Sequence, residues 1–127
     1  MKKLEIVIAG DAVLIKDRFQ RALSGIDGCL VVGVAIDEDA AVALICSLKP
    51  DVVILDIRMP HKNGIGVLKE VHSRNPSSAI IMFTADESVI LRDACLEAGA
   101  RFYLNRSQMT ELIDICRQQL AKKSDGV

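Results

Sequence analysis

The sequence VVILD at residues 52–56 places four consecutive apolar residues directly before a carboxylate. Such a run does not alternate with polar residues, so it predicts a β-strand that is covered on both faces, as in a parallel sheet. A carboxylate that follows a buried strand is costly without a partner. We therefore expect Asp56 to be a functional residue in the ligand crevice of an α/β fold.

Four other short apolar runs have the same character, and helical patterns separate them. The runs are LEIVIA at 4–9, LVVGVA at 30–35, AIIMF at 79–83 and RFYL at 101–104. The clearest helical stripe consists of Met109, Leu112, Ile113, Cys116 and Leu120. This alternation predicts an α/β fold, a (βα)5 doubly wound five-stranded parallel sheet in strand order 2-1-3-4-5 with helices on both faces.

Polar residues follow several of these strands, where ligands of such sheets bind. Asp11 follows the first strand and Asp56 the third, and two carboxylates this close repel each other unless a cation lies between them. A hard divalent ion with oxygen ligands, Mg²⁺, suits this arrangement. Thr84 after the fourth strand adds a hydroxyl, and Arg106 after the fifth adds a cation. Together they suit a phosphoryl group, with a carboxylate as its nucleophile.

Each of these residues also has a simpler interpretation. Asp11 can cap the first helix, a role that is compatible with metal binding. Thr84 can be a turn residue, and Arg106 can be a solvated surface charge. The interpretation as a phosphoryl site therefore depends on the residues lying together at one edge of the sheet.

Three segments resemble signatures of bacterial response-regulator receiver domains. VVILDIRMPHKNG at 52–64 resembles the phosphoacceptor segment, in which an apolar strand, Asp, Met-Pro and Gly occur at this spacing. MFTA at 82–85 and AGARFYL at 98–104 resemble two further signatures, in the family's order. The resemblance covers essentially the whole chain and implies a flavodoxin-like fold and a phosphorelay switch in signal transduction.

The resemblance implies a donor, an acceptor and a metal. Asp56 is the implied phosphoacceptor, and the donor is a sensor histidine kinase or a phosphotransfer protein. The implied Mg²⁺ ligands are Asp11, Asp56 and the backbone carbonyl of Arg58. Self-phosphotransfer to Asp56 and slow autodephosphorylation are the most catalysis that we expect, so whether the chain is an enzyme stays open.

The resemblance also implies a switch. Thr84, Ala85 and Arg106 are the implied contacts of the phosphoryl group, and Thr84 and Tyr103 are the implied switch residues. Their movement is expected to change the face formed by the fourth helix, the fifth strand and the fifth helix. That face would control a C-terminal output domain, as in transcription regulation, or a partner, or it would form a homodimer.

Two positions depart from the family pattern. The family usually has two adjacent acids after the first strand, and Gly10 replaces the first while Asp11 matches the second. Arg106 replaces a lysine, although a one-residue slip would place Asn105 there. We expect weaker Mg²⁺ binding and a retained positive charge. Two interpretations stay open, phosphorylation with altered kinetics or an atypical receiver that is a phosphate-independent protein-interaction module.

Other function classes lack their sequence signals. AGDAVLIK at 9–16 is not the glycine-rich loop that a flavin or nucleotide site requires. A phosphatase would need a second acid as general acid-base, and Gly10 removes the obvious candidate. A net charge of −1 without a basic block argues against nucleic-acid binding by this segment.

The remaining sequence features concern compartment and boundaries. No two of the four cysteines have C-x-x-C spacing, so we expect buried, reduced thiols. No segment is long enough to span a membrane, and we expect a cytoplasmic protein. The receiver domain is expected at 1–121, with 122–127 as a polar tail or the start of a linker to an output domain.

Overall fold

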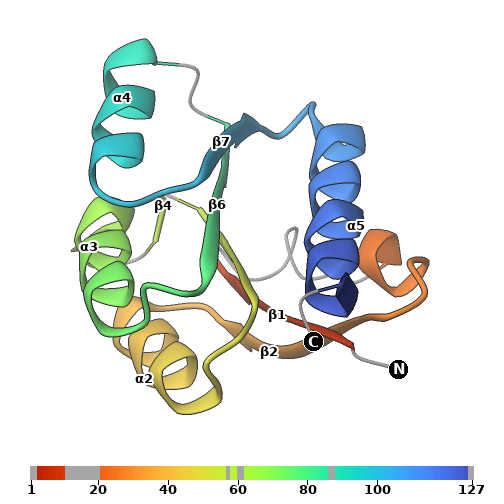
Figure 1. Cartoon of the computed structure of the whole chain (residues 1–127). Coiled ribbons are helices and arrows are strands. Elements are labelled where there is room, and N and C mark those ends of the chain that lie inside the picture. Colours follow the sequence, from red (N-terminus) through yellow and green to blue (C-terminus); the bar gives the residue numbers. More distant parts are fainter. Residues whose placement is uncertain (1–2, 11–20, 57, 60–61, 86–87, 126–127) are drawn as a thin grey trace.

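A computed structural model describes residues 3–10, 21–56, 58–59, 62–85 and 88–125 of the chain. Its centre is a five-stranded parallel sheet in the order β2-β1-β3-β6-β7 (Figure 1). The strands are β1 (Leu4–Ala9), β2 (Cys29–Ala35), β3 (Val52–Leu55), β6 (Ala79–Thr84) and β7 (Phe102–Asn105). Counted along the chain, these strands have the predicted order 2-1-3-4-5, so the predicted topology is confirmed.

Helices cover both faces of this sheet. They include α2 (Glu38–Leu48), α3 (Gly64–Arg74), α4 (Val89–Glu97) and α5 (Met109–Asp125), and residues 21–24 are also helical. Figure 1 shows α2, α3 and α4 on one side of the sheet and α5 with residues 21–24 on the other. The earlier residues of the predicted first helix, including Ile15 and Phe19, lie outside the described residues.

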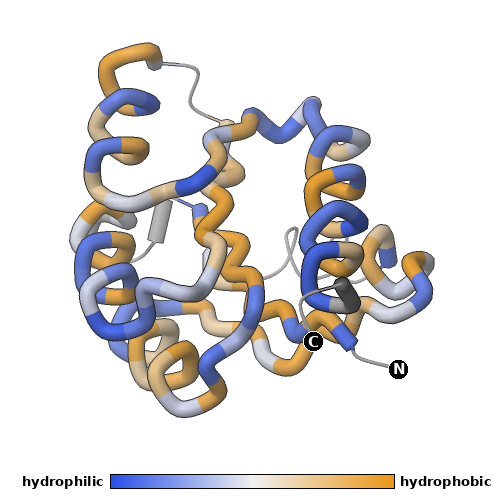
Figure 2. Tube along the Cα trace, viewed as in Figure 1, coloured by the Kyte–Doolittle hydropathy of each residue, from blue (hydrophilic) through white to orange (hydrophobic). Residues whose placement is uncertain are grey.

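Alternate residues of each strand enter two separate hydrophobic cores. Ile6, Ile54 and Ile81 pack in the core that contains Leu112 and Cys116 of α5. Their neighbours Val7, Val53 and Ile80 pack in the core that contains Ile45 of α2 and Leu68 of α3. Figure 2 shows the resulting apolar strands between helices of mixed polarity. Burial on both faces explains why the strand sequences do not alternate.

A small antiparallel ribbon follows Asp56 and was not predicted. It consists of β4 (Arg58–Met59) and β5 (Lys62–Asn63), with Arg58 opposite Asn63. Strands of two residues are too short for any periodic pattern, so the sequence offers no signal for them.

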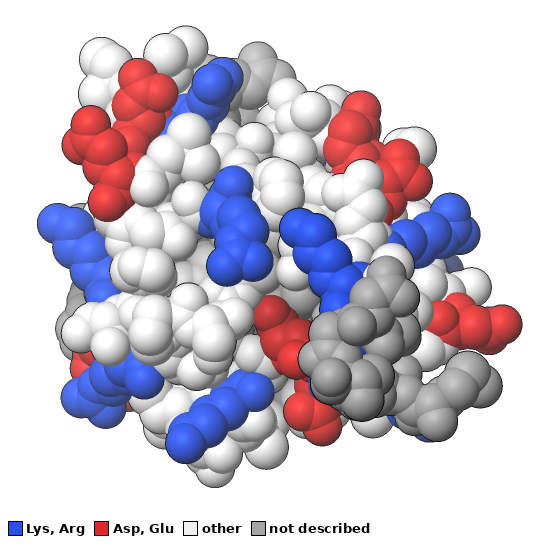
Figure 3. Space-filling view, viewed as in Figure 1, with Lys and Arg blue, Asp and Glu red and all other residues white. Residues whose placement is uncertain are grey.

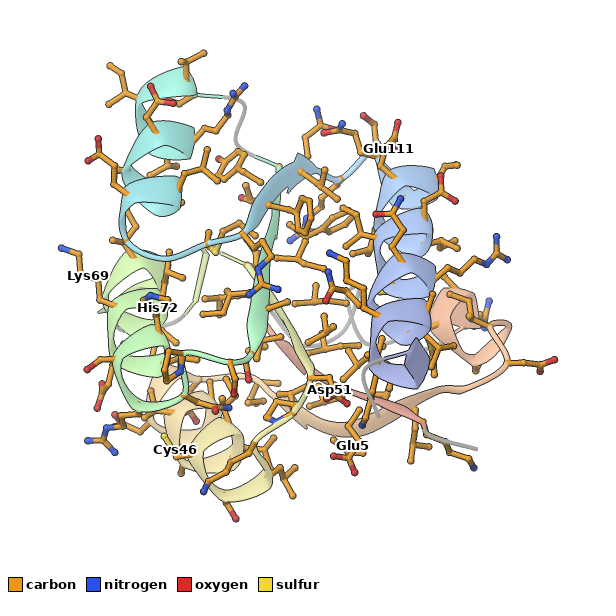
Figure 4. The ribbon with its side chains drawn as sticks, viewed as in Figure 1. Glu5, Cys46, Asp51, Lys69, His72 and Glu111 are labelled. Carbon is orange, nitrogen blue, oxygen red and sulfur yellow. The ribbon has the colours of Figure 1, made fainter. Side chains whose placement is uncertain are left out.

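Helix α5 continues to Asp125, although residues 122–125 were assigned to a polar tail or linker. Nζ of Lys123 lies 2.7 Å from the carbonyl oxygen of Lys3 and 2.7 Å from Oδ2 of Asp51. The same Oδ2 accepts a hydrogen bond of 2.8 Å from the backbone N–H of Glu5. Figure 4 labels Asp51 and Glu5 close together, where strands β1 and β3 begin. Tertiary hydrogen bonds thus hold a helical turn that has no apolar stripe.

None of the helices that the structure describes has the length and apolar character that a bilayer crossing requires. On the face shown in Figure 3, acidic and basic side chains are interspersed with uncharged ones. The described residues on this face therefore form no extended basic surface of the kind that binds nucleic acid.

Candidate phosphoryl site

The register of the sheet brings the ends of four strands to one edge. Leu55 pairs with both Ala9 and Met82, and Thr84 pairs with Asn105. The pairing continues one residue further, because the N–H of Asp56 donates to the carbonyl of Ala9 at 2.9 Å. The N–H of Gly10 likewise donates to the carbonyl of Ala35 at 3.0 Å, and Gly10 is buried. Gly10, Asp56, Thr84 and Asn105 therefore lie at the same edge.

Asp56 has a cationic partner there. Its side chain is only 1% exposed, and its Oδ2 accepts a hydrogen bond from Nη2 of Arg106. The Arg106 side chain is 27% exposed, so the pair is sheltered from water on the carboxylate side. A buried carboxylate is tolerated when a hydrogen-bonded cation compensates it. Arg106 is therefore not the solvated surface charge of the simpler interpretation.

A tight turn at the end of β7 presents Arg106 to this carboxylate. Oδ1 of Asn105 accepts hydrogen bonds from the N–H of Ser107, at 2.9 Å, and from the Ser107 hydroxyl. The N–H of Asn105 donates to Oε1 of Gln108 at 2.9 Å, and the N–H of Gln108 donates to the carbonyl of Asn105 at 3.0 Å. The Asn105 side chain is hydrogen-bonded within this turn, and the side chain that contacts Asp56 is that of Arg106.

The other residues predicted to contact the phosphoryl group or to switch occupy different environments. Thr84 is fully buried at the end of β6, whereas Ala85 is exposed. Tyr103 is half-buried in β7 opposite Met82, and it packs against the core on the α2–α4 side of the sheet. Their roles at a phosphoryl group stay predictions.

The predicted metal ligands are described only in part. Asp11 lies outside the described residues, and Arg58 is described by its backbone in β4. Among the described residues, no three His, Cys, Asp or Glu side chains are grouped as a metal site. Asp56 supplies one carboxylate, and Mg²⁺ in proteins often keeps several waters and binds one or two carboxylates. Asp56 therefore fits a Mg²⁺ ion, although the full ligand set stays a prediction.

The four cysteines take no part in this site. All four are free thiols. Cys95 and Cys116 are buried, as predicted, whereas Cys29 and Cys46 are only half-buried. Burial raises the pKa of the Cys116 thiol to about 12, and burial also raises the pKa of Cys95. For Cys29, burial raises the pKa against the opposing effect of Arg117. A raised pKa disfavours the thiolate that nucleophilic or metal-binding cysteines need.

Comparisons with known proteins point to one family. Residues 6–117 match the family described as response regulator receiver domain. The probable transcriptional regulatory protein NarL of Mycobacterium tuberculosis is 35% identical over 113 residues, which are 88% of this chain and 52% of that protein. Protein-glutamate methylesterase/protein-glutamine glutaminase 6 of Anaeromyxobacter dehalogenans is 30% identical over 122 residues, 96% of this chain and 34% of that protein.

Among solved structures, the response regulator domain of Thermotoga maritima CheB superposes with a TM-score of 0.85 and 25% identity. The match covers 94% of this chain and 98% of that domain. The chain thus spans about a third to a half of the two curated relatives but nearly all of the solved domain.

Proposed function

Because the chain belongs to the receiver domains of two-component response regulators, which act in phosphorylation-based signalling, we propose that it accepts a phosphoryl group on Asp56. One observation carries this proposal. Asp56 is a buried carboxylate at the edge where ligands of such sheets bind, and a guanidinium already contacts it. A carboxylate with only a structural role has no reason to lie where ligands of such sheets bind.

In the proposed transfer, a carboxylate oxygen of Asp56 attacks the phosphorus of a phosphohistidine. The phosphohistidine belongs to a sensor histidine kinase or a phosphotransfer protein, the class of partner with which receiver domains interact. An O–P bond forms and the P–N bond breaks, and the imidazole nitrogen keeps the bond electrons and takes up a proton. Arg106 offsets the negative charge that gathers around the transferred group.

Receiver domains generally bind Mg²⁺. In this chain Asp56, Asp11 and the backbone carbonyl of Arg58 would hold the ion, which supplies positive charge for the phosphoryl oxygens. Gly10 stands where the family usually has a further acid, and this loss of negative charge weakens the expected affinity. Asp56, Asp11, Thr84 and Tyr103 match the family pattern, which favours phosphorylation over a phosphate-independent module. Arg106 keeps a positive charge at the position of the family's lysine.

The proposed output surface is the face formed by α4, β7 and α5. Thr84 and Tyr103 would change position when the phosphoryl group is added, and this face would change with them. Val89 is 64% exposed and Ile90 is 83% exposed at the start of α4, which suits binding to a partner or to a second copy. The longer relatives favour a C-terminal output domain, as in transcription regulation, and a cytoplasmic location belongs to the same proposal.

Incubation with acetyl phosphate or phosphoramidate and Mg²⁺, followed by intact-mass measurement, tests the proposal. The expected product carries one phosphoryl group, which is absent from Asp56→Ala. Asp114→Ala, at an exposed aspartate of α5, is the matched control and should still be phosphorylated. If the wild-type chain forms no adduct and does not respond to beryllofluoride, the phosphate-independent interaction module is the better interpretation.

A further inference from the structure

Only one of the two parallel donors on one side of the Arg106 guanidinium makes a hydrogen bond to a described residue. Its Nη2 donates to Oδ2 of Asp56, while Nε on the same edge is buried and has no hydrogen-bond partner among the described residues. The Nε and Nη2 donors of an arginine point in parallel and match two oxygens of one anion. Of this pair, Asp56 therefore accepts from Nη2 only, although Nε and Nη2 together can donate to two acceptor atoms.

The turn around Arg106 holds this edge in place. Hydrogen bonds among Asn105, Ser107 and Gln108 fix the backbone on both sides of Arg106. The guanidinium is mostly sheltered from water, so its buried Nε cannot be satisfied by the surrounding solvent. A donor pair that is already ordered loses little conformational freedom when a ligand binds.

We propose that Arg106 determines how this site binds the phosphoryl group, by donating from both Nε and Nη2 to two phosphoryl oxygens. This inference rests on the proposed function of Asp56. In the unmodified protein Nη2 is occupied by the Asp56 carboxylate, and in the phosphorylated protein both donors face the tetrahedral group. The ligand class is a tetrahedral oxyanion or its mimic attached to Asp56.

Lysine cannot reproduce this contact. Its ammonium group is a single charged point, whereas the arginine edge supplies two parallel donors at fixed spacing. Arg106→Lys therefore keeps the charge and removes the paired geometry. The difference between the two side chains separates the proposed contact from simple charge compensation.

Calorimetric titration with beryllofluoride in the presence of Mg²⁺ tests the inference. Arg106→Lys is expected to weaken beryllofluoride binding roughly tenfold, the effect of one charge-assisted hydrogen bond. Arg106→Met, which also loses the charge, should weaken it further. Arg101→Lys is the matched control, because it makes the same exchange at an exposed arginine and should bind like the wild type.

Asn105→Ala adds an independent variant that keeps Arg106 and loosens its turn. It should weaken beryllofluoride binding to an intermediate degree, and it decides the question if Arg106→Lys does not fold. Wild-type affinity in both folded variants would overturn the two-donor contact and leave the proposed function intact. Absence of both beryllofluoride binding and phosphorylation in the wild-type chain would overturn the proposed function itself, and the two-donor contact with it.

Discussion

Arg106 and Asp56 are separated by 50 positions in the sequence, and their side chains share a hydrogen bond in which the two partners are unequally buried. Removing the cation leaves a carboxylate that is 1% exposed, whereas removing the carboxylate leaves a guanidinium that water can partly reach. We expect Arg106→Met to lower the free energy of unfolding by about 2–3 kcal/mol and Asp56→Asn by about 1 kcal/mol. Urea denaturation measures both values.

The double variant of Arg106→Met and Asp56→Asn checks the cause of this asymmetry. Because it no longer buries an uncompensated charge, it should be more stable than Arg106→Met alone. Additive losses would mean that the two side chains do not interact in solution.

Gly10 offers a test of the missing acid. Gly10→Asp should place a further carboxylate near Asp56 and Asp11, so repulsion lowers the thermal stability without Mg²⁺ and added Mg²⁺ restores it. Gly10→Asn is the matched neutral control and should show a smaller Mg²⁺ response. Thermal unfolding with and without Mg²⁺ gives the comparison. If Mg²⁺ stabilises Gly10→Asp no more than Gly10→Asn, the lost acid is not what weakens metal binding.

Two glycines should respond in opposite ways to alanine. Gly99 has a φ of +120°, and an added Cβ would collide with the ring of His72 on α3. We expect Gly99→Ala to lower the free energy of unfolding by roughly 2 kcal/mol or more. Gly66→Ala, at an exposed position within α3, should raise it by about 0.5–1 kcal/mol. Urea denaturation of both variants checks the signs, and equal effects would contradict this account.

The buried thiol of Cys116 predicts a dependence of stability on pH. Its pKa is raised from 9.0 to about 12 in the folded protein, so the unfolded chain loses this proton first. The free energy of unfolding should therefore fall as pH rises from 9.0 towards 12. Cys116→Ala and Cys116→Val both remove the thiol and should flatten this slope in urea titrations between about pH 8 and pH 10.5. A wild-type slope in both variants would assign the loss to other groups.

Lys123 should stabilise the last turns of α5 through Lys3 and Asp51. The Lys123–Asp51 pair is 30% exposed on each side, so we expect Lys123→Met to cost only about 0.5–1 kcal/mol. Hydrogen exchange of the α5 amides near Lys123 should become faster, while the first turns of α5 keep their protection. Lys122→Met, at the exposed neighbouring position, should change neither quantity.

The sheet could be predicted because its signal is local. Runs such as VVIL at 52–55 are apolar on both faces, and right-handed βα connections between them give a doubly wound parallel sheet. The order 2-1-3-4-5 was an expectation for such a sheet, and the structure confirms it. The contact of Arg106 with Asp56 could not be separated from a solvated charge, because it depends on the turn at Asn105 and on the register of β7. A signal for that turn was present in the asparagine and the serine two residues later.

Other features had no local signal. The β4–β5 ribbon is shorter than any hydrophobic period, and the last turn of α5 depends on Lys123 contacting residues that are distant in the sequence. The position of Asp56 directly after a buried strand was predicted from the apolar run before it. That Nε of Arg106 has no partner among the described residues could not be predicted, because a sequence does not show the geometry of hydrogen-bond donors.

Helix α5 runs without interruption from the Arg106 turn to the opposite edge of the sheet. It begins directly after the turn that carries Arg106, and near its other end Lys123 is bound to Asp51 and to Lys3 at the opposite edge of the sheet. Figure 4 places Glu111 at the first end and Asp51 near the second. A helix of 17 residues is about 25 Å long. Because one helix joins these two ends, a tilt of α5 at the Arg106 turn would also displace the contacts that Lys123 makes at the other end.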